Sequence, residues 1–160
     1  MFRAVVAFLA LPAVVAGVLP WVVSMQDSPR LPHSVFGIVP LLVGAGILLA
    51  SVMSFYRKGM GTLAPWDPPR LLVVSDLYRF TRNPMYLGIV ILLLGWAVVV
   101  GNLWNYVYSL CVLLVFHIRV IFYEEKEMRR RFPDDWARYC RHVPRWGIRL
   151  IPYSGCPRPR

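Results

Sequence analysis

Residues 85–118 read MYLGIVILLLGWAVVVGNLWNYVYSLCVLLVFHI, an apolar stretch without a single Asp, Glu, Lys or Arg. As one straight helix this stretch would be about 50 Å long, which exceeds the roughly 30 Å hydrocarbon layer of a bilayer. The dipeptide Gly101-Asn102 in its middle is a turn signal. The stretch therefore predicts a helical hairpin, with one helix at 84–100 and the next from 103 to about 123.

Two further uncharged runs precede the hairpin, at about 4–23 and 35–56. Both are long enough to cross a bilayer as helices, and the prolines of the first run should kink it. A cleaved signal peptide is the alternative for the first run, although Arg3 alone makes a weak n-region. We therefore expect an all-α membrane bundle of four spans, formed by a single domain over residues 1–160.

The composition agrees with a membrane protein. Of the 160 residues, 58% are hydrophobic and 16% are charged, which excludes intrinsic disorder and makes an ordinary soluble enzyme unlikely. Cys111, Cys140 and Cys156 are odd in number and unevenly spaced, so they indicate no disulfide framework. Cys140 lies near His142, but without a CxxC or HExxH pattern we expect no metal site.

The basic residues test the four-span arrangement. The net charge is +10, and 18 residues are Lys or Arg. With four spans, sixteen of them fall on the side that holds both termini, one (Arg30) falls on the opposite side, and Arg119 lies within the fourth span. This asymmetry predicts a multi-pass protein with both termini in the cytoplasm. It also removes nucleic acid as the partner of the basic residues, and anionic membrane lipids become the expected one.

Two regions, about 57–83 and 124–146, are expected outside the bilayer on this basic side. In the first, Ser75 or Asp76 is expected to cap a short helix through Thr81, and Asn83-Pro84 to start the third span. In the second, the fourth helix should continue to about Phe132. Asp134 or Asp135 is expected to cap another helix, at 136–143.

Several side chains near this basic side could carry chemistry. Arg119 lies at membrane depth, so it either serves a site or extends to the surface. Glu124 and Glu125 fit a carboxylate site, but their spacing alone favours a solvated turn paired with Lys126 and Arg129. Tyr78, Arg82 and Tyr86 follow one another at intervals of four, which indicates either an interfacial anchor belt or the wall of a binding site.

Two long motifs resemble a known family. Residues 72–88 read LVVSDLYRFTRNPMYLG, and residues 124–145 read EEKEMRRRFPDDWARYCRHVPR. The first resembles L-V-x-x-G-x-Y-x-x-x-R-H-P-x-Y-x-G, and the second resembles E-E-x-x-L-x-x-x-F-G-x-x-Y-x-x-Y-x-x-x-V-P-R. These are signatures of the isoprenylcysteine carboxyl methyltransferase and phospholipid methyltransferase family. The resemblance covers about residues 59–146.

The chain departs from these signatures at four positions. Asn83 stands where the family most often has His, so this position cannot titrate near pH 7. Asp76 and Pro133 each replace a Gly, and Trp136 replaces a Tyr. We expect these last three changes to affect the loops more than the chemistry.

The resemblance implies methyl transfer from S-adenosylmethionine by a small helical membrane enzyme, without the doubly wound methyltransferase fold. It places the cofactor on the cytoplasmic side, between the two motif regions. By position, the residues that would line this site are Arg70, Leu71, Leu72, Val73, Tyr78, Asn83, Pro84, Met85, Tyr86 and Glu124. Arg82 could hold the cofactor's carboxylate and Glu124 its ammonium or ribose hydroxyls, while tyrosine faces attract the sulfonium.

The expected acceptor is an amphiphile that enters sideways from the bilayer with its polar head near Arg119. Arg119 lies close to where family members carry a substrate-binding arginine, so Arg119 and Glu124 are the candidate catalytic residues. Isoprenylcysteine-like carboxylates and phospholipid-like headgroups both remain open. Two other functions remain as alternatives: a nicotinamide-dependent membrane reductase of the sterol reductase type, and a non-catalytic scaffold that binds lipids. The oligomeric state is not readable from the sequence.

Overall fold

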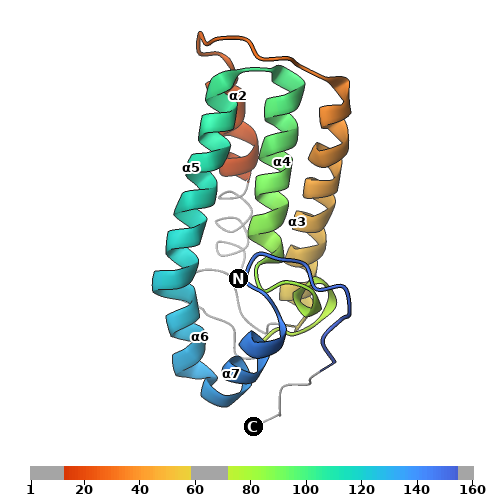
Figure 1. Ribbon diagram of the computed structural model, residues 1–160, viewed down its shortest axis with the longest axis vertical. Helices are drawn as coiled ribbons and strands as arrows, with labels where there is room; N and C mark the ends of the chain where they lie inside the picture. Colours follow the sequence, from red (N-terminus) through yellow and green to blue (C-terminus); the bar gives the residue numbers. More distant parts are fainter. Residues whose placement is uncertain (1–12, 59–71, 155–160) are drawn as a thin grey trace.

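The computed structural model describes residues 13–58 and 72–154, and these residues form helices and connecting loops without a strand. Four apolar helical segments lie side by side, and short helices close one end of the bundle (Figure 1). The segments are η1 (Val14–Val18) with α2 (Leu19–Ser24), η2 (Val35–Gly37) with α3 (Ile38–Lys58), α4 (Pro84–Val100), and α5 (Leu103–Arg119).

Two of the described helices, Val35–Ser54 and Leu103–Arg131, are long and apolar enough to cross a membrane, as judged by length and composition. Val14–Ser24 and Pro84–Val100 are shorter apolar helices. Part of the first expected span, including Pro12, lies outside the described residues. Pro20 of that span follows the π-helical turn η1. This irregular turn is consistent with a proline that lacks the N–H needed for a regular helix.

The predicted hairpin of α4 and α5 is confirmed. Gly101 ends α4 with φ of +67°, a left-handed conformation that glycine adopts without strain, and its N–H donates to the Ala97 carbonyl. The Asn102 side chain then caps α5 by accepting from the Trp104 backbone N–H at 2.8 Å. The Gly-Asn pair therefore ends one helix and starts the next.

Helices α3 and α4 pack with their backbones in close contact. A Cβ atom added to Gly44 would lie 2.4 Å from the backbone nitrogen of Leu92, and one added to Gly95 would lie 2.4 Å from that of Leu41. Only glycine fits at such distances, so these positions let the two helices approach more closely than larger residues permit. This packing fixes α4, whose first turn carries part of the candidate site.

A small polar network holds α2 against the hairpin at the end far from the short helices. The Ser24 hydroxyl accepts hydrogen bonds from Trp96 Nε1 at 3.1 Å and from Asn105 Nδ2 at 2.8 Å. Asn105 is 1% exposed. Buried polar side chains are stabilised by hydrogen-bond partners, and here the partners come from α2, α4 and α5. The network therefore joins these three helices at one point.

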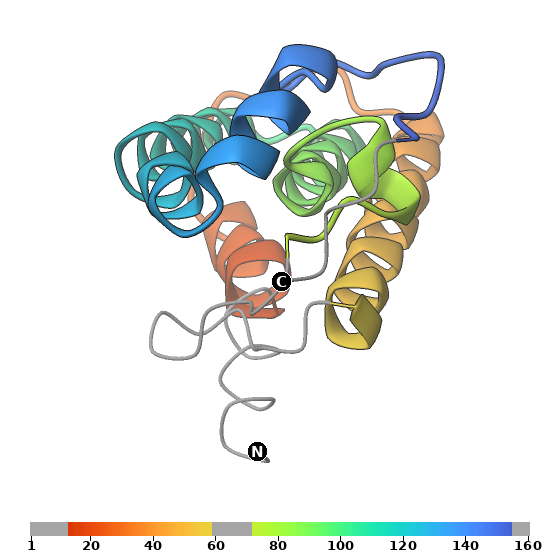
Figure 2. The ribbon, with the colours of Figure 1, turned by 90° about the horizontal axis from the view of Figure 1, so that it is seen from below.

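The short helices η3 (Asp76–Arg79), α6 (Glu125–Arg131) and α7 (Pro133–His142) form a cap at the opposite end. In Figure 2 the cap is seen from below, with α7 crossing from the end of α6 toward η3. The cap has its own apolar core, built on Leu72, Trp136, Tyr139 and Val143. This second core connects the segment before η3 to α7.

Three expected caps are corrected by the structure. Asp134 and Asp135 lie within the first turn of α7, which starts at Pro133 after Phe132 and ends at His142 rather than Val143. Proline is favoured at this first position because its missing N–H would have no partner there. Asn83 and Pro84 start α4 as predicted, with Asn83 at the N-cap, and Ser75 stands at the N-cap of η3; neither the Ser75 nor the Asn83 side chain makes a capping hydrogen bond.

The segment expected to be a short α-helix after Ser75 is the 3-10 turn η3. Asp76 begins it with φ of +51°, the left-handed conformation that favours glycine. This backbone conformation explains why a Gly at this position suits the family signature. The Asp76 carboxylate accepts a hydrogen bond from the Ser54 hydroxyl at 2.6 Å, so it also joins η3 to α3.

Candidate functional site

The candidate site is built around a π-helical turn, η4 (Val120–Glu124), where α5 passes into α6. In a regular α-helix, residues five apart point about 140° apart around the axis. The π turn brings such a pair together, because Arg119 Nε donates to Glu124 Oε1 at 2.8 Å. Single π turns of this kind occur frequently at functional sites.

Tyr86, in the first turn of α4, completes this group from the neighbouring helix. Its hydroxyl donates a hydrogen bond to Oε1 of Glu124, the same atom that accepts from Arg119. Its ring packs on Phe116 with a centroid distance of 4.3 Å. The Arg119 and Glu124 side chains are 42% and 30% exposed, so both can reach a ligand.

A second ionic group surrounds the adjacent carboxylate, Glu125. Arg145 donates to both of its oxygens, from Nε at 2.7 Å and from Nη2 at 2.8 Å. Arg82 Nη1 donates to Oε1 at 3.0 Å, and the Arg82 and Glu125 side chains are each 13% exposed. The hydrogen bond to Glu125 raises the pKa of Arg145, so this pair stays ionised.

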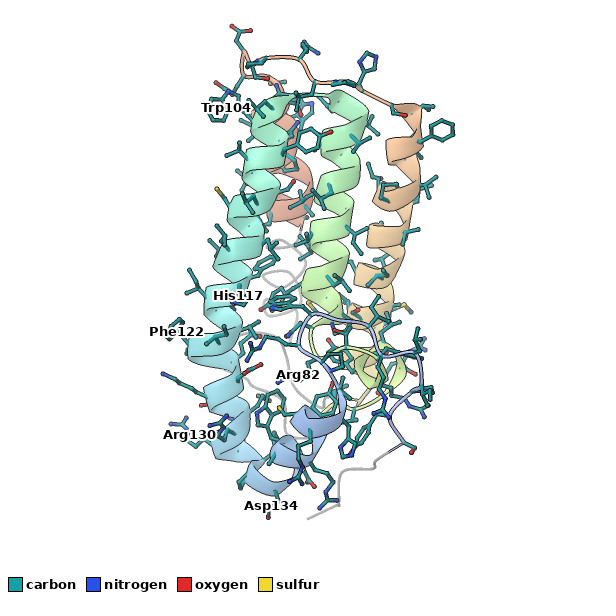
Figure 3. The ribbon with its side chains drawn as sticks, viewed as in Figure 1. Arg82, Trp104, His117, Phe122, Arg130 and Asp134 are labelled. Carbon is teal, nitrogen blue, oxygen red and sulfur yellow. The ribbon has the colours of Figure 1, made fainter. Side chains whose placement is uncertain are left out.

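Arg82 also contacts α7, and Figure 3 places it between the start of α4 and this helix. Its Nη1 lies 3.0 Å from Cys140 Sγ, and its guanidinium lies over the Trp136 ring, 5.9 Å from the centroid. Burial raises the pKa of the Cys140 thiol, while the Arg82 charge opposes this shift. Arg82 Nε is buried and has no hydrogen-bond partner among the described residues.

Backbone hydrogen bonds join the two signature regions directly. The Arg82 N–H donates to the Pro144 carbonyl at 3.0 Å. The Arg145 carbonyl accepts from Asn83 Nδ2 at 3.1 Å and from the Thr81 hydroxyl at 3.3 Å. The start of α4 and the segment after α7 are therefore held in one arrangement.

Tyr78 adds a neutral phenol to this region. Burial, and then the nearby charge of Glu124, raise the pKa of Tyr78. Its backbone carbonyl accepts a hydrogen bond from the Tyr139 hydroxyl at 2.6 Å. Burial raises the pKa of Tyr139 as well. Both phenols therefore remain protonated, and the Tyr139 hydroxyl uses its proton in the hydrogen bond to the Tyr78 carbonyl.

The remaining described residues that were expected to line the site are located by their burial and their place in the fold, not by side-chain contacts with Glu124 or Glu125. Leu72 and Val73 are buried, and Leu72 belongs to the apolar core of the cap. Pro84 is the first residue of α4 and is buried, whereas Met85 beside it is partly exposed. Arg70 and Leu71 lie outside the described residues.

The spacing-based interpretation of Glu124 and Glu125 as a solvated turn is wrong. Their ion-pair partners among the described residues come from α5, from the segment before α4 and from the segment after α7, and not from Lys126 or Arg129. Lys126 instead lies over the Phe122 ring. For Glu124 the π turn interrupts the regular helical spacing. Glu125 begins the regular helix α6, and its partners Arg82 and Arg145 reach it through the fold of the cap.

Two residues that contact the candidate site, Arg145 and Phe116, were not predicted from the sequence. Arg145 ends the second signature motif, so its place there is the signal that could have identified it. Phe116 has no such signal, because it is one of many apolar residues of α5. Its contact with Tyr86 depends on how α4 and α5 pack.

Comparison with known proteins places the chain in a family. The model of the phospholipid methyltransferase family matches residues 33–135. Protein-S-isoprenylcysteine O-methyltransferase of Schizosaccharomyces pombe is 35% identical over 82 residues, which are 51% of this chain and 34% of that protein. Delta(14)-sterol reductase TM7SF2 of Mus musculus is 33% identical over 98 residues, which are 59% of this chain and 22% of that protein.

These matches cover about a third or less of the two relatives' own length. No solved structure matches the chain. The family match takes in η2, α3, α4, α5 and both carboxylates of the site, and ends within α7. The chain belongs to the phospholipid methyltransferase family.

Proposed function

We propose that the protein is an integral membrane methyltransferase that uses S-adenosylmethionine to methylate an amphiphilic acceptor at the cytoplasmic face. The observation that carries this proposal is the group formed by Tyr86, Glu124 and Arg119. It joins both signature regions through the carboxylate Oε1, within a chain of a methyltransferase family.

The residues present fit this methyl donor. The partly exposed carboxylate of Glu124 suits its ammonium or ribose hydroxyls, and a guanidinium suits its carboxylate. The faces of Tyr86 and Phe116 suit a sulfonium cation. Among the described residues, Arg82 Nε is a buried donor without a hydrogen-bond partner, at the start of the segment that leads into α4. By position and contact, Tyr78, Arg82, Asn83, Pro84, Met85, Tyr86 and Glu124 are the residues that we assign to the donor, with Leu72 and Val73 supporting them from the cap core.

When bound, the donor supplies an activated methyl group on its sulfonium. The chain's own contribution is alignment, which can lower the barrier to a displacement by several kcal/mol. Tyr86 and Arg119 fix the orientation of Glu124 through hydrogen bonds to one oxygen. Glu125 fixes Arg82 and Arg145, and thereby holds the cap on α4.

The acceptor is expected near Arg119, whose side chain is 42% exposed at the end of α5. A carboxylate or thiolate acceptor is already nucleophilic and needs no base, whereas an amine must first lose a proton. Asn83 cannot take that proton, and its amide donor binds the Arg145 carbonyl. Glu124 and Glu125 are the candidates for such a base, but both are paired with arginines.

The topology proposed here has four spans, at about 4–23, 35–56, 84–100 and 103–123, with both termini cytoplasmic. Its support is the placement of sixteen of 18 basic residues on the side of the cap. The cap then meets the water phase, where a soluble donor arrives, while the acceptor comes from the membrane lipids. The site regions are 57–83 and 124–146 of one domain.

A second candidate function follows from the similarity to the mouse sterol reductase. A reductase would bind a nicotinamide cofactor in place of the methyl donor. The test is methyl transfer from labelled S-adenosylmethionine into a lipid extract, with prenylcysteine analogues assayed in parallel. Label in an extractable acceptor supports the proposal. Binding of the nicotinamide cofactor, with no methyl transfer, would favour the reductase.

A further inference from the structure

The segment after α7 carries three large aliphatic side chains that the protein leaves uncovered. Ile148, Leu150 and Ile151 are 66%, 93% and 69% exposed. They lie between Trp146 and Tyr153, two residue types that are enriched where membrane and water meet. Three adjacent exposed aliphatic residues on a cytoplasmic cap need a partner of their own.

Hydrogen bonds fix the backbone of this segment, so the exposure of its aliphatic side chains is a property of the folded protein. The Arg149 N–H donates to the Phe80 carbonyl at 2.9 Å, and the Tyr153 N–H donates to the Arg79 carbonyl at 3.1 Å. Arg79 Nε donates back to the Tyr153 carbonyl at 2.7 Å. These bonds hold one side of the segment against η3 and turn the aliphatic side chains outward.

The same contacts place the segment at the depth where the apolar helices end. Trp146 Nε1 donates to His117 Nδ1 at 3.0 Å, and His117 lies near the end of α5, before the apolar residues of η4 (Figure 3). His117 lies six residues before Tyr123, the last residue before Glu124, so Trp146 contacts the apolar part of this helix. Phe122 and Tyr123 are still 64% and 55% exposed, as expected for lipid-facing side chains.

The charges beside the segment match one kind of partner. Arg149 lies within it and donates to the His142 carbonyl at 3.0 Å, and Arg141 of α7 is exposed nearby in sequence. Between Trp146 and Tyr153 there is no acidic residue. Basic and aliphatic side chains together indicate binding to a membrane surface. There, anionic lipid headgroups attract the basic side chains, and the acyl chains beneath them take up the aliphatic ones.

We propose that residues 146–153 are an interfacial anchor, which inserts Ile148, Leu150 and Ile151 into the cytoplasmic leaflet of the bilayer. The anchor connects to both sides of the candidate site, through His117 on α5 and through Phe80 before α4. It therefore fixes the height of the cap relative to the membrane surface from which an acceptor arrives. This proposal does not depend on which reaction the protein catalyses.

The test uses single-cysteine spin labels on the full chain in nanodiscs that contain anionic lipid. Cys140 is replaced by Ser, and Cys111 and Cys156 by Ala, before Leu150→Cys is introduced. Retained alone, the exposed Cys111 of α5 is the lipid-facing control. Asp134→Cys is the aqueous control, because Asp134 lies at the end of the molecule far from Trp104 (Figure 3). Circular dichroism confirms that each variant keeps its helix content.

The anchor predicts that the label at 150 is relaxed more by oxygen, which concentrates in lipid, than by an aqueous nickel chelate. The lipid-facing label at Cys111 should behave in the same way. The aqueous label at position 134 should be relaxed more by the nickel chelate than by oxygen. Equal behaviour of positions 150 and 134 would overturn the proposal. Protection of position 150 from both reagents would also overturn it, because a protein surface would then cover the segment.

Discussion

Arg119 and Glu124 form an ion pair across five residues of one helix, with Nε and Oε1 2.8 Å apart. The π turn between them makes this possible, since a regular α-helix would separate the two side chains around its axis. The same carboxylate oxygen accepts from Tyr86 of α4. One irregular turn therefore connects the expected acceptor side of the site to the expected donor side.

Replacing Glu124 by Ala should weaken binding of S-adenosylhomocysteine by roughly 10-fold, or about 1.4 kcal/mol, because the acceptor that Tyr86 and Arg119 share is lost. Tyr86→Ala should act in the same direction. Calorimetry on the detergent-purified protein measures both. Glu127→Ala is the matched control, since Glu127 pairs with Arg130 and Arg131 on the surface. Wild-type affinity in the Glu124 and Tyr86 variants would remove both residues from the donor site.

Arg119→Ala should reduce acceptor turnover more than donor binding, because the exposed guanidinium is expected to face the acceptor's polar head. Turnover is followed with labelled donor, and donor binding is followed by calorimetry. Arg119→Lys keeps the charge and should restore part of the turnover. A variant that loses donor affinity but keeps acceptor turnover at saturating donor would contradict this role.

Arg145→Lys should destabilise the cap by about 1–2 kcal/mol, because a lysine cannot donate to both oxygens of Glu125 in the same geometry. Thermal unfolding in detergent reports the change. The control is Arg130→Lys, whose 77% exposed side chain pairs with Glu127 and should cost under about 0.5 kcal/mol. Equal effects at the two positions would show that the Glu125 group does not hold the cap.

Gly44→Ala should destabilise the bundle by about 1–3 kcal/mol, because its Cβ would lie 2.4 Å from the Leu92 nitrogen and push α3 away from α4. Gly46 provides a control in the same helix, since a Cβ there meets nothing within 4 Å. Gly46→Ala should be neutral or slightly stabilising. If both substitutions leave the unfolding midpoint unchanged, the close packing of α3 on α4 is not as described.

Ser24→Ala should cost about 1–3 kcal/mol, because it leaves the donors of Trp96 and Asn105 without their shared acceptor. The exposed Ser28, which bonds only to its neighbour's carbonyl among the described contacts, is the control. Thermal unfolding of the two alanine variants compares them directly. A midpoint for Ser24→Ala equal to that of Ser28→Ala would argue against the network.

The helical hairpin was predictable because its signals are local. A span of apolar residues and the pair Gly101-Asn102 define where α4 ends and α5 begins, and the structure has the same boundaries. The helix at Val35–Ser54 follows from length and hydropathy in the same way. The short helices were less predictable, since Pro133 rather than an aspartate starts α7.

The pairings within the site could not be predicted from spacing. Helical periodicity assigned Lys126 and Arg129 to the two glutamates, whereas the π turn directs Glu124 to Arg119. Arg145 reaches Glu125 from 20 residues away, through the fold of the cap. The signature motifs identified the right region, because both groups of contacts lie within them, but not which residues meet.

The most direct test of the account is calorimetric titration of the detergent-purified wild-type protein with S-adenosylhomocysteine, with a nicotinamide dinucleotide titrated in parallel. The account predicts saturable binding of S-adenosylhomocysteine, which Glu124→Ala weakens and Glu127→Ala does not. Absence of any affinity for S-adenosylhomocysteine in a folded wild-type sample, together with binding of the nicotinamide dinucleotide, would contradict it.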